Sequence, residues 1–114
     1  MAERRVVITG MGLVSPLGAS MDETWENILA AKSGIKTIEG FDTEEYSVKI
    51  GGAVPDFDMS EYIPTKESRR MDGFIQFGLV AGIQALDDAG NVVPKVSGHQ
   101  FQELRLVFRS GPAR

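Results

Sequence analysis

The sequence predicts an α/β fold within a single domain. Two observations support this: a β-branched, strand-like run stands near the N-terminus, and two stretches with helical spacing of apolar residues follow it. The chain has 114 residues, of which 42% are hydrophobic and 25% are charged, and this is the balance of a globular protein. A chain of this length holds one domain at most.

The first predicted element is a strand over residues 4–12. Val6, Val7 and Ile8 form a continuous apolar run that ends in a Gly-Met-Gly sequence. A run without polar alternation is typical of a strand buried on both faces of a sheet. Residues 15–18, Ser-Pro-Leu-Gly, predict a turn after it.

The second predicted element is a helix that begins after Ser20 and stops at Gly34. Ser20 and Glu23 form the Ser-x-x-Glu capping box that marks a helix N-terminus. Residues 35–57 then predict a loop followed by a weak strand over residues 48–54. The large apolar side chains of the helix fall on one face: Trp25, Ile28 and Leu29.

The third predicted element is a long helix. Asp58 or Ser60 can cap a single helical turn before it, and Thr65 can cap the helix itself, which runs to Asp88 and stops at Gly90. Its apolar residues extend nearly all round, which predicts a buried helix, although the run is too short to cross a bilayer. Glycine lowers the stability of a helix interior, and this helix contains three: Gly73, Gly78 and Gly82. Their presence suggests that another backbone packs closely against the helix.

Composition excludes several classes of function. The chain has no cysteine and a single histidine, His99, which removes disulfides, thiolate metal sites, cysteine nucleophiles and paired-histidine zinc sites. The apolar run at residues 6–8 is far too short for a signal peptide or a membrane span, so a cytoplasmic location is expected. The net charge of −4 disfavours nucleic-acid binding, and it divides unevenly into −7 over residues 1–90 and +3 over residues 91–114.

Three possible functional motifs are weak. The Gly10-Met11-Gly12 sequence is similar to a dinucleotide-binding fingerprint, but Ser15 stands where the third glycine should be, so we favour a glycine-rich turn. Asp87 and Asp88 are neighbours on a helix and point in different directions, so we interpret them as solvating side chains. His99 is expected to be a surface side chain.

A basic cluster is the strongest candidate site. Lys66, Arg69 and Arg70 are spaced at i, i+3 and i+4, which places all three near one face of the predicted helix start. The helix dipole opposes cations at a helix N-terminus, so an anionic partner would explain them. A solvated basic face with Glu67 as a neighbour is the alternative.

Several segments together resemble one family, the β-ketoacyl-acyl-carrier-protein synthases, and within it the N-terminal part of the synthase II type of type II fatty acid synthesis. The resemblance covers about residues 4–90. The segments that carry it are residues 4–18, Trp25, residues 31–35, residues 41–42, Phe57, residues 66–78 and residues 81–85.

This resemblance implies a fold and a chemistry. The fold is the N-terminal part of a thiolase-like αβαβα architecture, with residues 1–90 forming the N-terminal portion of the synthase N-terminal domain. The chemistry is decarboxylative condensation of an acyl thioester with malonyl-carrier protein in fatty acid biosynthesis, and the family carries it out with one cysteine and two histidines that come later in its chains. We therefore expect no catalytic residue, no metal, no cofactor and no activity in this chain alone.

The resemblance also implies a role for the basic cluster. Lys66, Arg69 and Arg70 match positions where such synthases present cations to acyl carrier protein, which is acidic and bears a phosphopantetheine phosphate. Acyl carrier protein is thus the expected partner. The parent family is homodimeric, and neither nucleic acid nor a membrane span is expected.

Residues 91–114 depart from the family pattern. We predict a divergent tail, produced by a frameshift or a truncated reading, which the two other reading frames of the coding DNA beyond codon 90 would test. A buried strand that lacks its neighbours loses most of its apolar burial, so we also expect the isolated chain to be marginally stable or prone to aggregate.

Two other classes of function stay open. A nucleotide-binding oxidoreductase predicts that NADPH quenches the fluorescence of Trp25. A non-catalytic interaction module predicts salt-sensitive binding of acyl carrier protein that is lost when Lys66, Arg69 and Arg70 become Glu.

Overall fold

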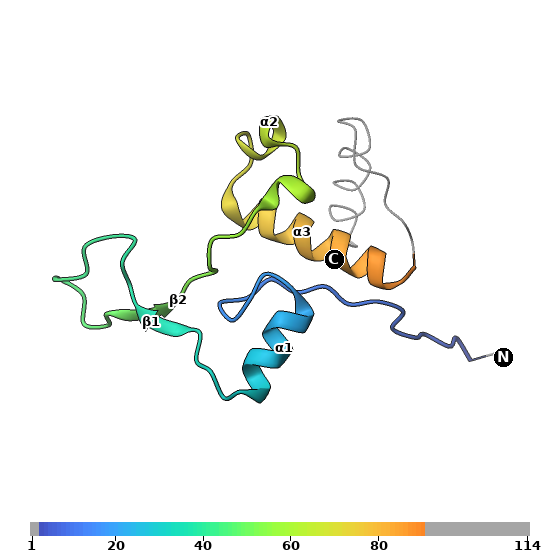
Figure 1. Cartoon of the computed structure of the whole chain (residues 1–114), viewed down its shortest axis with the longest axis horizontal. Helices are drawn as coiled ribbons and strands as arrows, with labels where there is room; N and C mark the ends of the chain where they lie inside the picture. The colour runs from blue at the N-terminus through green and yellow to red at the C-terminus, as the bar shows by residue number, and fades with distance from the viewer. Residues whose placement is uncertain (1–2, 91–114) are drawn as a thin grey trace.

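The computed structural model describes residues 3–90, which form α1 (Met21–Leu29), β1 (Ile35–Thr37), β2 (Ile50–Gly52), η1 (Met59–Glu61), α2 (Thr65–Ser68) and α3 (Gly73–Asp88) (Figure 1). The α/β composition predicted from the sequence is present in this part of the chain. The predictions made for residues 91–114, namely a divergent tail and a surface position for His99, lie outside the described residues.

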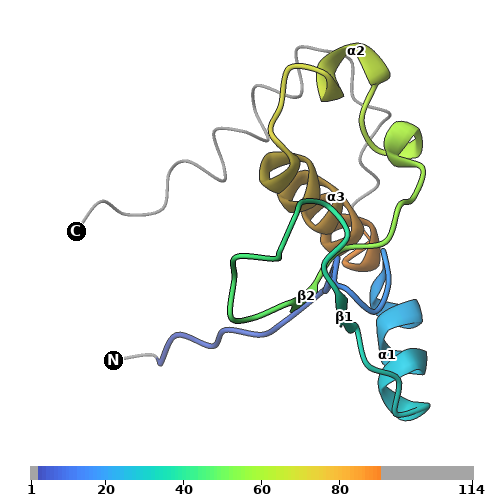
Figure 2. The same cartoon turned by 90° about the vertical axis from the view of Figure 1, so that its left-hand side faces the viewer.

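Helix α3 is the element against which residues 10–13 and the segment before α2 pack. Residues 10–13 of the N-terminal segment (residues 3–14) lie against α3, and Figures 1 and 2 show the chain before them extending away from this helix toward the N-terminus, while the β1–β2 hairpin also projects away from α3. Two hydrogen bonds fix this arrangement: the Met11 amide donates to Asp88 Oδ2 at 2.9 Å, and the Leu13 amide donates to Gln84 Oε1 at 3.2 Å.

Glycines permit the close contact between the N-terminal segment and α3. A Cβ added at Gly12 would collide with the Ala81 carbonyl oxygen, and one added at Gly10 would collide with the Ala85 carbonyl oxygen. Among the described residues, a Cβ added at Gly73 or Gly78 of α3 would meet no atom within 4 Å apart from the neighbouring backbone of the helix itself. The expectation that another backbone packs against these two helix glycines is therefore wrong, since it is the glycines of the N-terminal segment that the packing requires.

The strand predicted over residues 4–12 is not formed among the described residues. The segment has no ladder partner within residues 3–90, and Val6, Val7 and Ile8 are 89%, 64% and 81% exposed. A strand depends on a neighbour that pairs with its backbone and covers its faces, and no other described segment lies alongside these residues to do so.

Helix α1 begins where the sequence predicts. The Glu23 amide donates to Ser20 Oγ at 3.2 Å, and Glu23 Oε2 accepts from the Ala19 amide at 3.0 Å, so the capping-box pair satisfies donors at the helix start. The helix ends at Leu29, earlier than the predicted stop at Gly34. Ala31 takes up the left-handed conformation with φ of 53°, which usually falls to glycine.

The predicted weak strand is present in part as β2, which pairs antiparallel with β1. Ile35 lies opposite Gly52 and Thr37 lies opposite Ile50. Strand β1 was not predicted, because its three residues lie within a polar, glycine-containing stretch. The predicted turn at residues 15–18 is confirmed by the Ser15 and Gly18 backbones, which exchange hydrogen bonds of 2.9 and 3.1 Å.

The long helix predicted from Thr65 to Asp88 is two helices. Helix α2 has Pro64 at its N-cap and Arg69 at its C-cap, and α3 starts after Asp72, which is extended with ψ of 154°. Thr65 is therefore a helix residue and not a cap. Asp58 caps η1 as expected, because its carboxylate accepts from the Ser60 amide at 2.8 Å.

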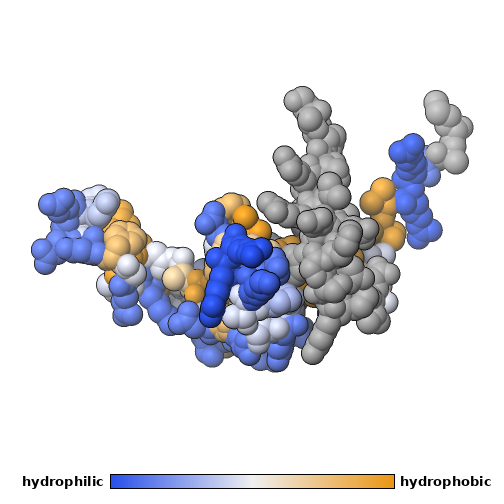
Figure 3. Space-filling model, turned by 90° about the horizontal axis from the view of Figure 1, so that it is seen from above, coloured by the Kyte–Doolittle hydropathy of each residue, from blue (hydrophilic) through white to orange (hydrophobic). Residues whose placement is uncertain are grey.

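The core lies where the segment before α2 meets one side of α3. Ile63, Leu79 and Val80 are its buried members, and partly buried side chains pack against them: Val14, Phe57, Tyr62, Met71 and Ile75. Phe74 is 73% exposed, so α3 is buried on one side and not nearly all round. In Figure 3, apolar residues are visible on the hairpin and on the N-terminal segment. No helix within residues 3–90 has the length and apolarity to cross a bilayer.

Candidate functional site

The three cations of the predicted basic cluster lie on one short stretch of chain. Lys66 is in α2, Arg69 is its C-cap and Arg70 lies in the link to α3, and all three side chains are exposed. We call residues 64–71 the basic turn. The cations do not sit at the start of a long helix as expected, so the argument from an opposing helix dipole no longer applies. Their exposure on a chain segment with net charge −7 still needs an explanation.

The basic turn is held at both ends by the core. Ile63, just before it, is fully buried, and Met71, its last residue, packs against the same cluster. Backbone hydrogen bonds close the turn internally: the Glu67 amide donates to the Pro64 carbonyl at 2.9 Å, and the Arg70 amide donates to the Glu67 carbonyl at 3.0 Å. The cations are therefore carried on an ordered loop with fixed ends.

One side chain of α3 reaches the basic turn. Gln76 Nε2 donates to the Ser68 carbonyl at 2.8 Å and to the Met71 carbonyl at 2.9 Å. Gln76 was not among the site residues predicted from the sequence. The available signal was a lone amide side chain within the otherwise apolar stretch from Phe74 to Ile83.

Other polar side chains act in packing. Asp88 accepts from the Met11 amide, so interpreting it as a purely solvating side chain is wrong, whereas Asp87 is exposed. Gly10 and Gly12 contact the backbone of α3, and the next helix, α1, begins only at Met21. The Gly-Met-Gly sequence thus has a packing role and does not open a helix as a phosphate-binding turn does.

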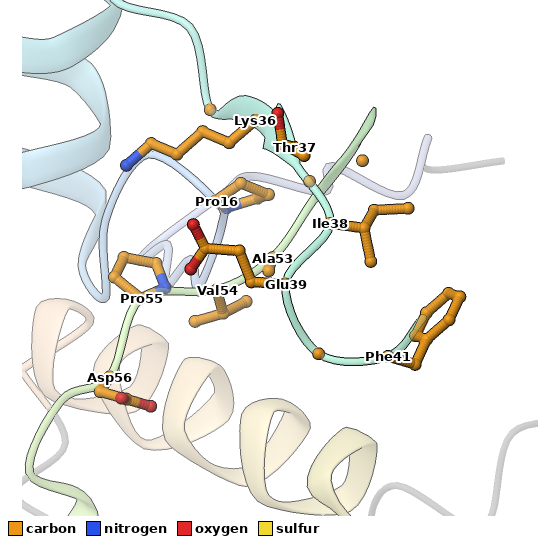
Figure 4. A pocket seen from close by; sticks show the side chains of 14 residues that line it. Pro16, Lys36, Thr37, Ile38, Glu39, Phe41, Ala53, Val54, Pro55 and Asp56 are labelled. Atoms are coloured by element: carbon orange, nitrogen blue, oxygen red, sulfur yellow. The ribbon is translucent and has the colours of Figure 1, made fainter. Parts of the chain in front are cut away.

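A hollow of about 810 Å³ lies between the hairpin and the turn that contains Pro16. Figure 4 shows Lys36 and Phe41 at opposite sides of this hollow, with Glu39 between them. A smaller hollow of about 290 Å³ is lined by Asp22, Asp87 and Asp88 among others. Within residues 3–90 no group of three or more His, Cys, Asp or Glu side chains is placed so that it could hold a metal ion.

The comparisons with known proteins identify the family. The model of the "Beta-ketoacyl synthase, N-terminal domain" family matches residues 3–104. The chain belongs to the β-ketoacyl synthase family. The resemblance to the N-terminal part of synthase II enzymes is thereby confirmed, since a Vibrio harveyi relative named 3-oxoacyl-[acyl-carrier-protein] synthase 2 is 51% identical over 90 residues.

Further relatives agree with this assignment. A Staphylococcus aureus (strain COL) protein of the same name is 48% identical over 86 residues, which is 75% of this chain and 21% of the relative. The Vibrio harveyi match covers 79% of this chain and 22% of the relative, so the chain spans about a fifth of the length of these relatives.

A solved structure, the ishigamide ketosynthase/chain length factor, matches with a TM-score of 0.67 and 32% identity over 84% of this chain and 24% of that one. The described residues therefore share the fold of part of a ketosynthase.

Proposed function

We propose that the chain is the N-terminal portion of a β-ketoacyl-acyl-carrier-protein synthase and that it provides a docking surface for acyl carrier protein. The relatives that it matches are named for action on a carrier-protein-linked acyl group. The activity of the complete protein in this proposal is decarboxylative condensation in fatty acid biosynthesis. Its thiolase-like αβαβα layers, homodimeric assembly and cytoplasmic location belong to the same proposal.

The observation that carries the docking surface is the exposed cation set of the basic turn. Lys66, Arg69 and Arg70 project from an ordered loop, although residues 1–90 carry 8 Lys and Arg against 15 Asp and Glu. Such a local positive patch attracts an acidic partner, accelerates its encounter and fixes its register. An acidic carrier protein with a phosphate-bearing arm has the complementary chemistry.

The chain by itself would bind without catalysing. It contains no cysteine to hold an acyl thioester, and its single histidine is His99. The nucleophile and the proton-handling groups of the condensation would have to come from residues beyond this sequence. Purified alone, the chain is expected to form no condensation product from acyl and malonyl thioesters, and measurable turnover would contradict this part of the proposal.

The docking surface is tested by charge reversal in the full 114-residue chain. The variant with Lys66, Arg69 and Arg70 replaced by Glu should bind the phosphopantetheine-bearing acyl carrier protein of Vibrio harveyi at least about tenfold more weakly, because attraction becomes like-charge repulsion. Wild-type affinity should fall as salt rises from 50 to 300 mM, since exposed charges are screened. Isothermal titration calorimetry measures both effects.

A matched control separates a local patch from net charge. Replacing Arg5, Lys32 and Lys36 by Glu changes the net charge by the same amount at exposed positions away from the basic turn. This control should keep most of the affinity. Equal binding by all three proteins, or equal losses in the two variants, would overturn the assignment of the docking surface to the basic turn.

A further inference from the structure

We propose that Gln76 is a positioning residue of the docking surface: its side-chain amide fixes the basic turn against α3 and so sets the direction in which Arg69 and Arg70 face the partner. This inference rests on the proposed function. Gln76 carries no charge, and it acts through the turn that it binds.

The geometry is a two-point clasp. Gln76 Nε2 donates to the Ser68 carbonyl at 2.8 Å and to the Met71 carbonyl at 2.9 Å, so both amide hydrogens are used. Ser68 and Met71 immediately flank Arg69 and Arg70 in sequence. The clasp therefore holds the chain on either side of the two arginines.

The clasp supplies hydrogen-bond donors to backbone carbonyl groups at the break between α2 and α3. Carbonyl groups at the end of a helix lack intrahelical partners, and they cost free energy if they are left unpaired away from water. Ser68, the last residue of α2, accepts from the Met71 amide at 3.1 Å as well as from Gln76, which fills both lone pairs of its oxygen. An apolar side chain at position 76 would leave this break without its link to α3.

A fixed turn matters for recognition because the bound arrangement is already formed in the free protein. When a binding-competent conformation is only partly populated, the apparent affinity falls by that fraction. The core holds the two ends of the basic turn through Ile63 and Met71. Among the described residues, Gln76 is the only one whose side chain joins the backbone of the turn to α3 by hydrogen bonds. Removing the clasp should thus lower affinity while leaving every cation in place.

The test is Gln76→Met in the full chain. Methionine is a good helix former of similar length but has no donor. Affinity for the phosphopantetheine-bearing carrier protein of Vibrio harveyi should fall roughly tenfold, as expected if the turn keeps its arrangement about a tenth of the time. The dependence of log affinity on log salt should keep its wild-type slope, because the number of cations is unchanged. A purely electrostatic loss would change that slope.

Gln84→Met is the matched control. Gln84 lies two turns further along α3 and also bridges two backbone groups, accepting from Leu13 and donating to the Ala19 carbonyl at 2.6 Å. It should cost similar stability and leave the affinity near that of the wild type. If Gln76→Met and Gln84→Met bind equally well while the charge-reversed turn does not bind, the clasp is overturned and the docking surface stands. If the charge-reversed turn binds like the wild type, the docking surface itself fails.

A measurement on the wild-type chain decides the matter even if Gln76→Met does not fold. Binding at the turn and closure of the clasp favour each other reciprocally, so a bound partner must stabilise the clasp. The side-chain amide hydrogens of Gln76 should exchange with solvent several times more slowly when carrier protein is bound, whereas those of Gln84 should not change. Equal exchange of the Gln76 hydrogens in the free and bound states would overturn the inference.

Discussion

Replacing Gly12 by Ala should detach the N-terminal segment from α3. The new Cβ would collide with the Ala81 carbonyl oxygen and come within 2.8 Å of Gln84 Cβ, and neither atom is the end of a flexible side chain. Overpacking of this kind costs about 1–3 kcal/mol. The hydrogen bonds from Met11 and Leu13 contribute about 1 kcal/mol each to holding the segment, so a clash of this size offsets them and the segment detaches.

Amide hydrogen exchange measures this effect at the two hydrogen bonds themselves. A penalty of about 1–3 kcal/mol corresponds to exchange of the Met11 and Leu13 amides that is faster by roughly five- to a hundredfold, or that reaches the unprotected rate. Gly78→Ala is the control, since an added Cβ meets nothing within 4 Å and the substitution favours the helix by about 1 kcal/mol. Unchanged protection in Gly12→Ala, or no protection of either amide in the wild type, would refute the packing.

Three further predictions concern local structure. Ala31→Gly should stabilise the end of α1 by up to about 1 kcal/mol, because φ is 53° there, and slower exchange of the Ala31 amide would show it. Thr24→Val should cost about 1–3 kcal/mol by removing a buried hydroxyl that lies 2.8 Å from Ser15 Oγ, and Thr24→Ser should recover much of this loss in urea unfolding. Hydrogen bonds from the Ser60 side chain and then its backbone lower the pKa of Asp58. The η1 cap should therefore persist below the ordinary pKa of the carboxyl group and be lost only as pH falls through the lowered value. A chemical shift of the Ser60 amide that titrates at or above the ordinary pKa would contradict this prediction.

Local signals in the sequence were sufficient for some of the ends and turns of the elements. The Ser20 and Glu23 box starts α1, Asp58 caps η1, and Gly90, with φ of 79°, follows the C-cap of α3. Each of these features depends on a side chain and a backbone only a few residues apart. Such features can therefore be predicted from a short stretch of sequence.

Features that depend on distant contacts could not be predicted in the same way. The strand expected at residues 4–12 needs neighbours that no local pattern supplies. The break between α2 and α3 is satisfied by Gln76, which lies eight residues from Ser68 and on a different helix. Gly12 and Ala81, which approach closely, are separated by most of the described chain, and a close approach was predicted at glycines of the helix instead.

The sequence indicates which residues form the candidate site but not how they are arranged. Lys66, Arg69 and Arg70 stand out in the sequence because they gather on an acidic chain. Their placement on a turn that is held by buried residues and by Gln76 depends on tertiary packing. The charge of the site is thus a property of three residues, whereas its orientation is a property of the contact between the basic turn and α3.

Chemical-shift mapping tests the central claim most directly. An isotope-labelled full chain is titrated with phosphopantetheine-bearing acyl carrier protein while the backbone amides are followed. The largest shifts should fall on residues 64–76 and disappear at high salt, with the hairpin hollow around Lys36 and Phe41 unchanged. Shifts centred on the hairpin or on the acidic hollow near Asp87, with the basic turn unmoved, would contradict it.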